Sequence, residues 1–123
     1  MTEVMELLLK AEMPDLPSKE IKIKRLSDIC GGPVVFSLKA LTFSQVAELK
    51  EAHNGDNLTL HIILAGVVSP DLKAKELLTK YNAATPLEML KKILLPGELE
   101  DISREVEKLS GYRSSTLEEI KKK

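Results

Sequence analysis

The sequence predicts a single α+β domain in which an N-terminal antiparallel β-hairpin packs on a mostly helical bundle. Alternating apolar residues between positions 20 and 41 indicate strands, and the rest of the chain shows helical spacing interrupted by proline and glycine. Aromatic residues make up only 3% of the composition and apolar residues 43%. The core must therefore consist mostly of Leu, Ile, Val and Met, which suits packed helices. A chain of 123 residues is long enough for one such core.

Composition and charge exclude several classes of protein. The net charge is -1, from 18 basic and 19 acidic side chains, so the chain has no general attraction to DNA or to anionic membranes. The apolar run 62–68 is far shorter than the roughly 20 residues that a membrane-spanning helix needs. The acidic N-terminus lacks the basic lead of a secretory signal, and the single cysteine excludes an internal disulfide. We therefore expect a cytoplasmic protein without a membrane span.

Residues 2–11 predict a short amphipathic helix with Val4, Leu7 and Leu8 on one face. Two prolines follow within residues 13–18 and disfavour any continuation of this helix. The apolar face must either fold back onto the domain or be covered by another chain. The expected organisation is a helix and proline-containing linker over residues 1–18 and a single α+β domain over residues 19–123.

Two strands are predicted next. In residues 20–24, Ile21 and Ile23 alternate with charged side chains, as in a half-buried strand. Residues 28–33 supply turn residues, which predict a direct β-hairpin to a second strand at 33–41. The expected inward face of the second strand consists of Val34, Phe36, Leu38 and Ala40.

The remaining elements are predicted to be helical. Thr42 and Gln45 form a possible capping box for a helix that runs toward His53. Residues 58–68 alternate at first like a strand, but we favour a buried helix because no strand partner is evident. Ser69-Pro70 and Thr85-Pro86 each predict a helix with a hydroxyl cap and proline in the first turn.

After Pro96-Gly97, we expect a further helix that starts at Glu98 and ends before Gly111. Residues 115–118 can begin a last turn before the three terminal lysines. The apolar positions of the three helices after Ser69 are Leu72, Leu77, Leu78, Tyr81, Leu87, Leu90, Ile93, Leu94, Ile102, Val106 and Leu109.

No arrangement of residues indicates catalysis. His53 is expected at the surface and His61 in the core, and their spacing is not that of a zinc-binding helix. Cys30 has no histidine nearby in the sequence, so we expect a structural thiol. Pro33 directly follows Gly31-Gly32 and removes a backbone donor that a phosphate loop would need. The carboxylates within 98–107 alternate with basic residues, as on a solvated helix face.

Residues 82–112 carry a resemblance to a known family. The segments Asn82-Ala83-Ala84-Thr85-Pro86-Leu87-Glu88-Met89-Leu90, Lys91-Lys92-Ile93-Leu94-Leu95-Pro96-Gly97-Glu98 and Leu109-Ser110-Gly111-Tyr112 are similar to the tail assembly chaperones of Gram-positive phages and defective prophages. The segment 67–72 and the predicted hairpin followed by Leu41-Thr42 fit the same pattern. The resemblance covers most of residues 19–112, and its motifs are turns and caps rather than catalytic residues.

The resemblance implies a binding protein and no enzyme, with no cofactor and no metal. Its expected partner is the tape measure protein, which it would keep soluble until the tail tube protein polymerises around it. Such proteins act in the host cytoplasm, are absent from the mature virion, and often have a longer form made by ribosomal frameshifting. The ending Lys121-Lys122-Lys123 is compatible with an A-rich slippery site, which the codons of the gene would establish or exclude.

Two hypotheses about binding follow from the sequence. The candidate partner-binding residues are Val4, Leu7, Leu8, Leu94 and Leu95. An apolar groove between helices would favour the chaperone function. A clustered basic face would favour the alternative, a small regulatory or adaptor protein that binds nucleic acid or another protein.

Overall fold

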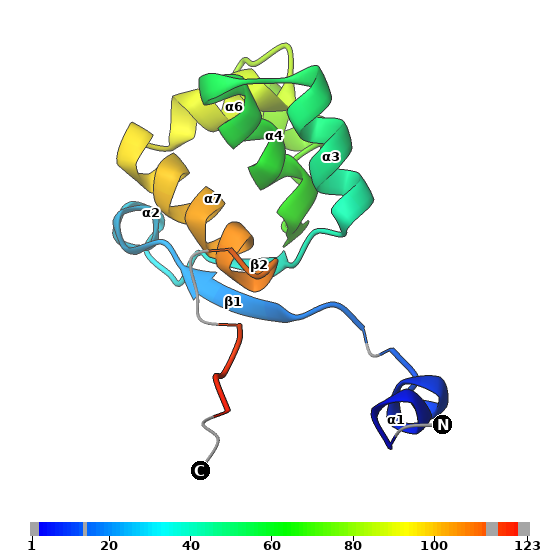
Figure 1. The fold of residues 1–123 in the computed structure, drawn as a ribbon. Coiled ribbons are helices and arrows are strands. Elements are labelled where there is room, and N and C mark those ends of the chain that lie inside the picture. The colour runs from blue at the N-terminus through cyan, green and yellow to red at the C-terminus, as the bar shows by residue number, and fades with distance from the viewer. Residues whose placement is uncertain (1–2, 14, 113–115, 121–123) are drawn as a thin grey trace.

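The computed structural model of the chain describes residues 3–13, 15–112 and 116–120. Its body consists of a three-stranded antiparallel sheet with helices packed on one face (Figure 1). The strands are β1 (Ser18–Lys22), β2 (Val35–Lys39) and β3 (Val67–Ser69), in the order β1-β2-β3. The α+β class and the N-terminal antiparallel pair predicted from the sequence are therefore confirmed.

The connection between β1 and β2 is a helix, where the sequence analysis expected only turn residues. Helix α2 covers Lys24–Cys30 and ends at Gly31, which adopts a left-handed conformation with φ 73°. The Ser27 hydroxyl donates to the Ile23 carbonyl at 2.8 Å and accepts from the Val34 amide at 2.8 Å. This buried serine ties α2 to the strand that follows it, which explains why a short helix replaces the tight turn.

The strand β3 corrects the expectation that residues 67–72 hold only a helix end and a helix cap. Val67 pairs with Leu38 and Ser69 with Ser37, so β-branched residues extend the sheet. Ser69 ends this strand, and helix α5 begins only at Lys75 and runs to Lys80. Between them the Lys73 amide donates to the Asp71 carboxylate at 3.0 Å, which forms a local turn.

The other helices lie close to their predicted positions. Helix α3 (Phe43–Ala52) begins at the predicted capping box of Thr42 and Gln45. Helix α4 covers Gly55–Gly66, which confirms the helical interpretation of that segment up to residue 66. Helix α6 (Pro86–Ile93) has Thr85 as its cap, and α7 (Pro96–Leu109) starts two residues before the predicted Glu98.

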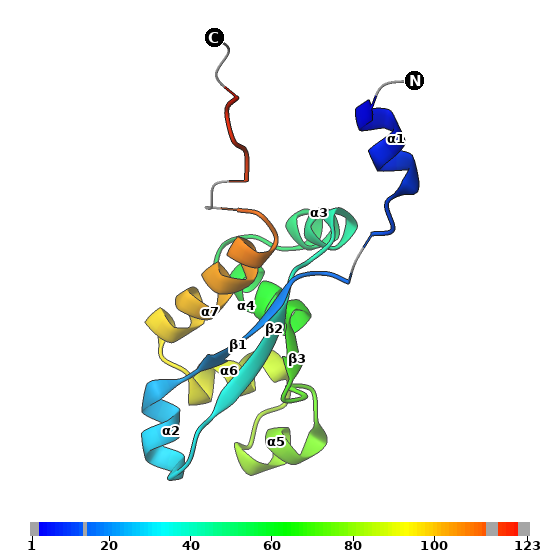
Figure 2. The same cartoon turned by 90° about the horizontal axis from the view of Figure 1, so that it is seen from below.

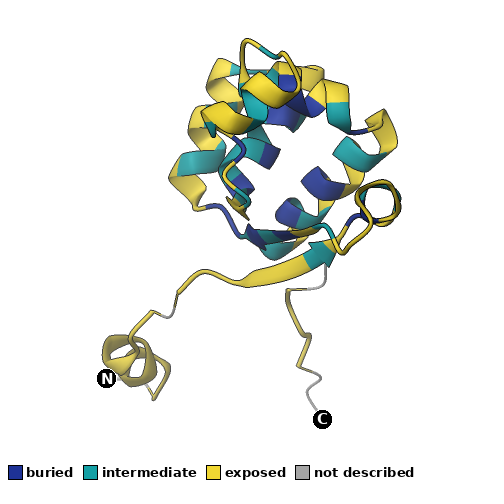
Figure 3. Cartoon of the chain, turned by 180° about the vertical axis from the view of Figure 1, so that it is seen from behind, coloured by how far each residue is buried: buried dark blue, intermediate teal, exposed yellow. Residues whose placement is uncertain are grey.

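The core lies between the sheet and the helices, and Figure 3 shows its buried positions facing inward. Gly66 allows α4 to approach α7 closely in this core, because a Cβ there would lie 2.6 Å from both Val106 methyl carbons. The fully buried large side chains come from β2, α4, α6 and α7 and are Leu38, Ile63, Met89, Leu90 and Val106.

The two ends of the chain stand apart from this core. Helix α1 (Glu3–Lys10) forms where residues 2–11 predicted it, and all its residues are exposed. Residues 116–120 form neither helix nor strand, so the predicted last turn is not seen there, and Ser115 lies outside the described residues. The terminal lysines 121–123 also lie outside them. Among the described residues, no helix is long and apolar enough to cross a membrane.

Candidate functional site

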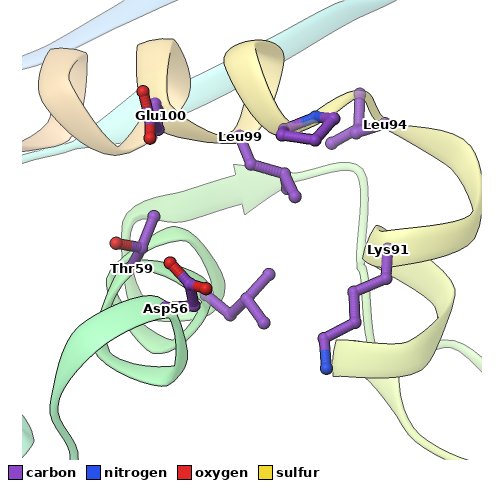
Figure 4. A pocket seen from close by; sticks show the side chains of 8 residues that line it. Asp56, Thr59, Lys91, Leu94, Leu99 and Glu100 are labelled. Atoms are coloured by element: carbon purple, nitrogen blue, oxygen red, sulfur yellow. The ribbon is translucent and has the colours of Figure 1, made fainter.

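The first hollow in the surface, here called the α4–α7 hollow, lies where α4 faces the junction of α6 and α7. Its volume is about 280 Å³. Figure 4 shows Asp56 and Thr59 on the α4 side and Leu99 and Glu100 on the α7 side. Polar groups therefore surround an apolar floor, which suits the binding of an apolar side chain from another molecule. The remaining lining residues are Leu60, Lys91, Leu94 and Pro96.

A second and larger hollow, the β1–α7 hollow, lies between the β1–α2 segment and α7. Its volume is about 500 Å³. Ile21 and Ile23 contribute apolar surface from one side, and Leu95 and Ile102 contribute it from the other. Lys22, Lys24 and Arg25 make a basic bank, while Glu98, Asp101 and Glu105 make an acidic bank along α7.

The ion pair of Arg25 and Glu98 crosses the β1–α7 hollow. The Arg25 guanidinium donates to both Glu98 carboxylate oxygens, at 3.1 and 2.7 Å, and to the Ile93 carbonyl at 2.8 Å. The hydrogen bonds from Arg25 lower the pKa of Glu98, against an opposing effect of burial. The same carboxylate accepts from the Leu95 amide at 2.7 Å, so Glu98 links the start of α7 to α2.

The other acidic residues of this bank are also paired. Lys19 of β1 donates to Glu105, which lowers the pKa of that carboxylate, and Lys108 contributes further. Asp101 accepts from Arg104 at 3.2 Å. The predicted solvated face of α7 thus exists, but two of its carboxylates bind basic residues from the segment 19–25 rather than from α7 alone.

Helix α1 presents the third apolar surface. Val4, Leu7 and Leu8 share one face and keep 64%, 67% and 62% of their surface exposed. Large apolar side chains this exposed, at neighbouring positions of one helix, are typical of a surface that another chain covers.

The structure brings together only part of the predicted binding set. Leu94 is 4% exposed and lies in the floor of the α4–α7 hollow, whereas Leu95 is 52% exposed and lines the β1–α7 hollow. The two residues thus face the two hollows from either side of the α6–α7 junction. Val4, Leu7 and Leu8 lie on α1, which stands apart from α6 and α7 (Figure 2).

The residues that β1 and α2 add to the site were not predicted from the sequence as binding residues. Ile21 and Ile23 were assigned to one face of a strand, and their alternation was the signal that they face an apolar surface. Nothing local indicated Arg25, because its partner Glu98 is 73 positions away.

The two histidines lie together instead of separately. His53 follows α3 and His61 lies in α4, and their rings stack at 3.6 Å with an interplanar angle of 11°. Both are half-buried, whereas the sequence analysis expected one at the surface and one in the core. Burial, and to a smaller extent the charge of His53, lowers the pKa of His61. Cys30 is exposed at the end of α2, and no group of three metal-ligating side chains occurs within the described ranges.

Comparison with known proteins adds to this geometry. The chain matches the family described as phage XkdN-like tail assembly chaperone protein over residues 5–122. It is also similar to a solved structure, the crystal structure of the protein yqbn from a structural genomics consortium, with a TM-score of 0.67 and 25% identity. That similarity covers 86% of this chain and 94% of the other. No curated protein matches the chain. The family match includes both hollows and most of α1.

Proposed function

The chain belongs to the family of phage XkdN-like tail assembly chaperone proteins, and on this premise we propose that it binds the tape measure protein and keeps it soluble during tail assembly. The observation that carries the proposal is the exposed apolar stripe of α1, with Val4, Leu7 and Leu8 each more than 60% exposed. A chaperone needs such a surface, because its client is a chain whose own apolar surface is not yet covered.

The two hollows support the same function. Both have mainly apolar linings with charged residues around them, and the sequence analysis named an apolar groove as the feature that favours a chaperone. An amphipathic client helix can insert its apolar side chains between helices while its charged residues stay in water. The client-binding surface is proposed to include Val4, Leu7 and Leu8 of α1 together with Leu94 and Leu95 at the two hollows.

The remaining features of the function follow from the family. The protein would act in the cytoplasm of the host bacterium and leave before the virion is complete, when the tail tube protein covers the tape measure protein. A longer form made by frameshifting would carry the same domain. Binding and release of this kind need no catalytic residue and no cofactor, so we infer that the protein is not an enzyme.

The test is co-expression with the tape measure protein of the same gene cluster. We expect the two proteins to co-purify and the soluble fraction of the tape measure protein to rise. Replacing both Leu7 and Leu8 by Asp should reduce both effects, because charged residues then occupy the apolar stripe. The matched control is Leu9→Asp, on the same helix but off the stripe. No co-purification and no gain in solubility, with the longer form also tested, would contradict the proposal.

A further inference from the structure

We propose that α1 of one copy docks in the β1–α7 hollow of a second copy, so that the chain self-associates through its N-terminal helices. The chain carries an uncovered apolar helix and an uncovered apolar hollow, and their charges are complementary. The proposal concerns the chaperone without its client and does not depend on which client it binds.

The helix has the chemistry of a groove-binding segment. Val4, Leu7 and Leu8 follow the spacing i, i+3, i+4 and therefore form one stripe. Glu3 and Glu6, also three positions apart, form an acidic flank beside it. With only eight residues, α1 is too short to be a stable helix in water by its own propensity. Packing of its apolar stripe against another surface would supply the missing stability.

The hollow offers the complementary surface. Its volume of about 500 Å³ lies within the roughly 300–1,000 Å³ typical of binding pockets, and Leu95 at its edge is 52% exposed. All three acidic residues of its α7 bank already form ion pairs. On the opposite bank, Lys22 and Lys24 are exposed and have no ion pair within the described part of the chain. The available charge beside the apolar floor is therefore basic, which favours an acidic flank such as that of α1.

The path of the chain favours a second copy over the same copy. The Ala40 amide donates to the Pro17 carbonyl at 2.8 Å, so the ladder between β1 and β2 fixes the chain direction up to Pro17. From there the chain leads away from α2, and α1 lies beyond the opposite end of β1 (Figures 1 and 2). Docking in its own hollow would require the linker to reverse and run back along β1. Docking in a neighbour requires no reversal, and exchange of a terminal element between copies is a low-cost route to dimers.

The docked state would also affect client binding. Because the exchange covers the stripe of α1 and Leu95, surfaces that we propose for the client, a client would have to displace the neighbouring copy. This consequence rests on the proposed function, whereas self-association itself is measured on the chain alone. Failure of one proposal is therefore distinguishable from failure of the other.

The first experiment measures self-association of the full chain by sedimentation over a range of concentrations. Leu7→Asp combined with Leu8→Asp should weaken it by about tenfold or more, since each such loss of apolar contact costs affinity exponentially. Leu9→Asp, on an equally exposed neighbour off the stripe, should leave it unchanged. Lys22→Glu should weaken association, and Glu6→Lys in the same chain should restore it. A chain that stays monomeric at every concentration overturns the proposal, as does an equal effect of Leu9→Asp.

The second experiment locates the contact by disulfide cross-linking in a Cys30→Ser background. One copy carries Leu8→Cys, and a second copy with a different tag carries Leu95→Cys. We expect a cross-linked pair made of the two different copies. The control pairs a copy that carries Leu8→Cys with a copy that carries Phe43→Cys, an exposed position at the start of α3. This pair should give no cross-link. A chain that carries both Leu8→Cys and Leu95→Cys and forms only an internal cross-link would show docking within one copy and overturn the exchange.

Discussion

Arg25 and Glu98 are 73 positions apart, yet their contact positions three elements at once. Arg25 belongs to α2, its second acceptor is the carbonyl of Ile93 in α6, and Glu98 accepts from the Leu95 amide at the start of α7. The side chains of the pair keep 36% and 20% of their surface exposed, so solvent screens their attraction. The pair therefore fixes the relative positions of α2, α6 and α7 more than it stabilises the fold.

Replacing Glu98 by Gln should lower the free energy of unfolding slightly at pH 7, because the charge of the pair is lost. The folded state lowers the pKa of Glu98. Its contribution is therefore fully present above the ordinary glutamate pKa of 4.5 and is lost as the pH falls through the lower, folded value. Urea unfolding at pH 7 and below pH 4.5 measures the free energy of unfolding of both proteins, and we expect the values of the variant and the natural chain to converge in acid. Glu100→Gln, at an exposed position of the same helix, should show no such difference. If the free energies of unfolding of Glu98→Gln and the natural chain differ by the same amount at all pH values, the expectation is contradicted.

Protonation at the stacked histidines should also destabilise the fold, but nearer to neutral pH than protonation of Glu98. Because burial lowers the pKa of His61, the folded state resists taking up a proton there. The unfolded chain binds that proton more readily, so stability should fall as the pH drops below the ordinary histidine pKa of 6.5. Thermal melts of the natural chain and of His61→Gln between pH 7.5 and 5.5 should differ in slope, with the variant less sensitive. Parallel slopes would show that other groups cause the pH dependence.

Among the elements, α4 and α7 pack closely against each other at Gly66. The nearest atoms to a Cβ at Gly66 would be the methyl carbons of Val106, a side chain that is fully buried. The two helices can approach this closely only because residue 66 has no side chain.

Gly66→Ala should therefore destabilise the fold by about 1–3 kcal/mol, the usual cost of overpacking a core. Gly97→Ala is the matched control, since nothing lies within 4 Å of a Cβ at that position in the first turn of α7. It should be neutral or stabilising by up to about 1 kcal/mol, because alanine restricts the unfolded chain. Chemical denaturation measures both. Adding Val106→Ala to Gly66→Ala should cost less than the sum of the two single changes, and strict additivity would contradict a direct clash.

The same elements show which parts of the fold could be predicted from the sequence. Strand β2 and helices α6 and α7 were found because their apolar periodicity and caps are local signals. Helix α2 and strand β3 were missed because they cover seven and three residues, too few for a period to appear. The formation of β3 depends on distant contacts, such as Val67 with Leu38, and no local pattern encodes these.

The whole molecule divides into a core and an N-terminal extension. Nothing in α1 is buried, whereas the ladder of β1 extends back to Pro17. The candidate site includes both parts. Its α1 stripe, Leu94 and Leu95 were named from the sequence. The hollows were not, since one arises only when α4 packs beside the α6–α7 junction and the other only when the β1–α2 segment packs beside α7.

Removing residues 1–15 should leave the free energy of unfolding of the monomeric chain unchanged within about 0.5 kcal/mol, because the described residues of this segment are all exposed. Self-association and client binding should both be lost, because both proposals need the stripe of α1. Denaturation, sedimentation and co-purification check the three statements separately. A large loss of stability would instead place α1 against the core of its own copy.

The contacts that α7 makes with β1 and with α4 also determine when the domain can form during synthesis. β1 is completed by residue 22, but its ion pair with Glu105 and the packing of Gly66 against Val106 need α7, which ends at Leu109. Almost the entire described chain must therefore emerge from the ribosome before the core closes. Until then, β1 and β2 lack α7, the helix that packs beside them. In every newly made copy, the apolar residues of the core therefore stay exposed to solvent until α7 has been synthesised.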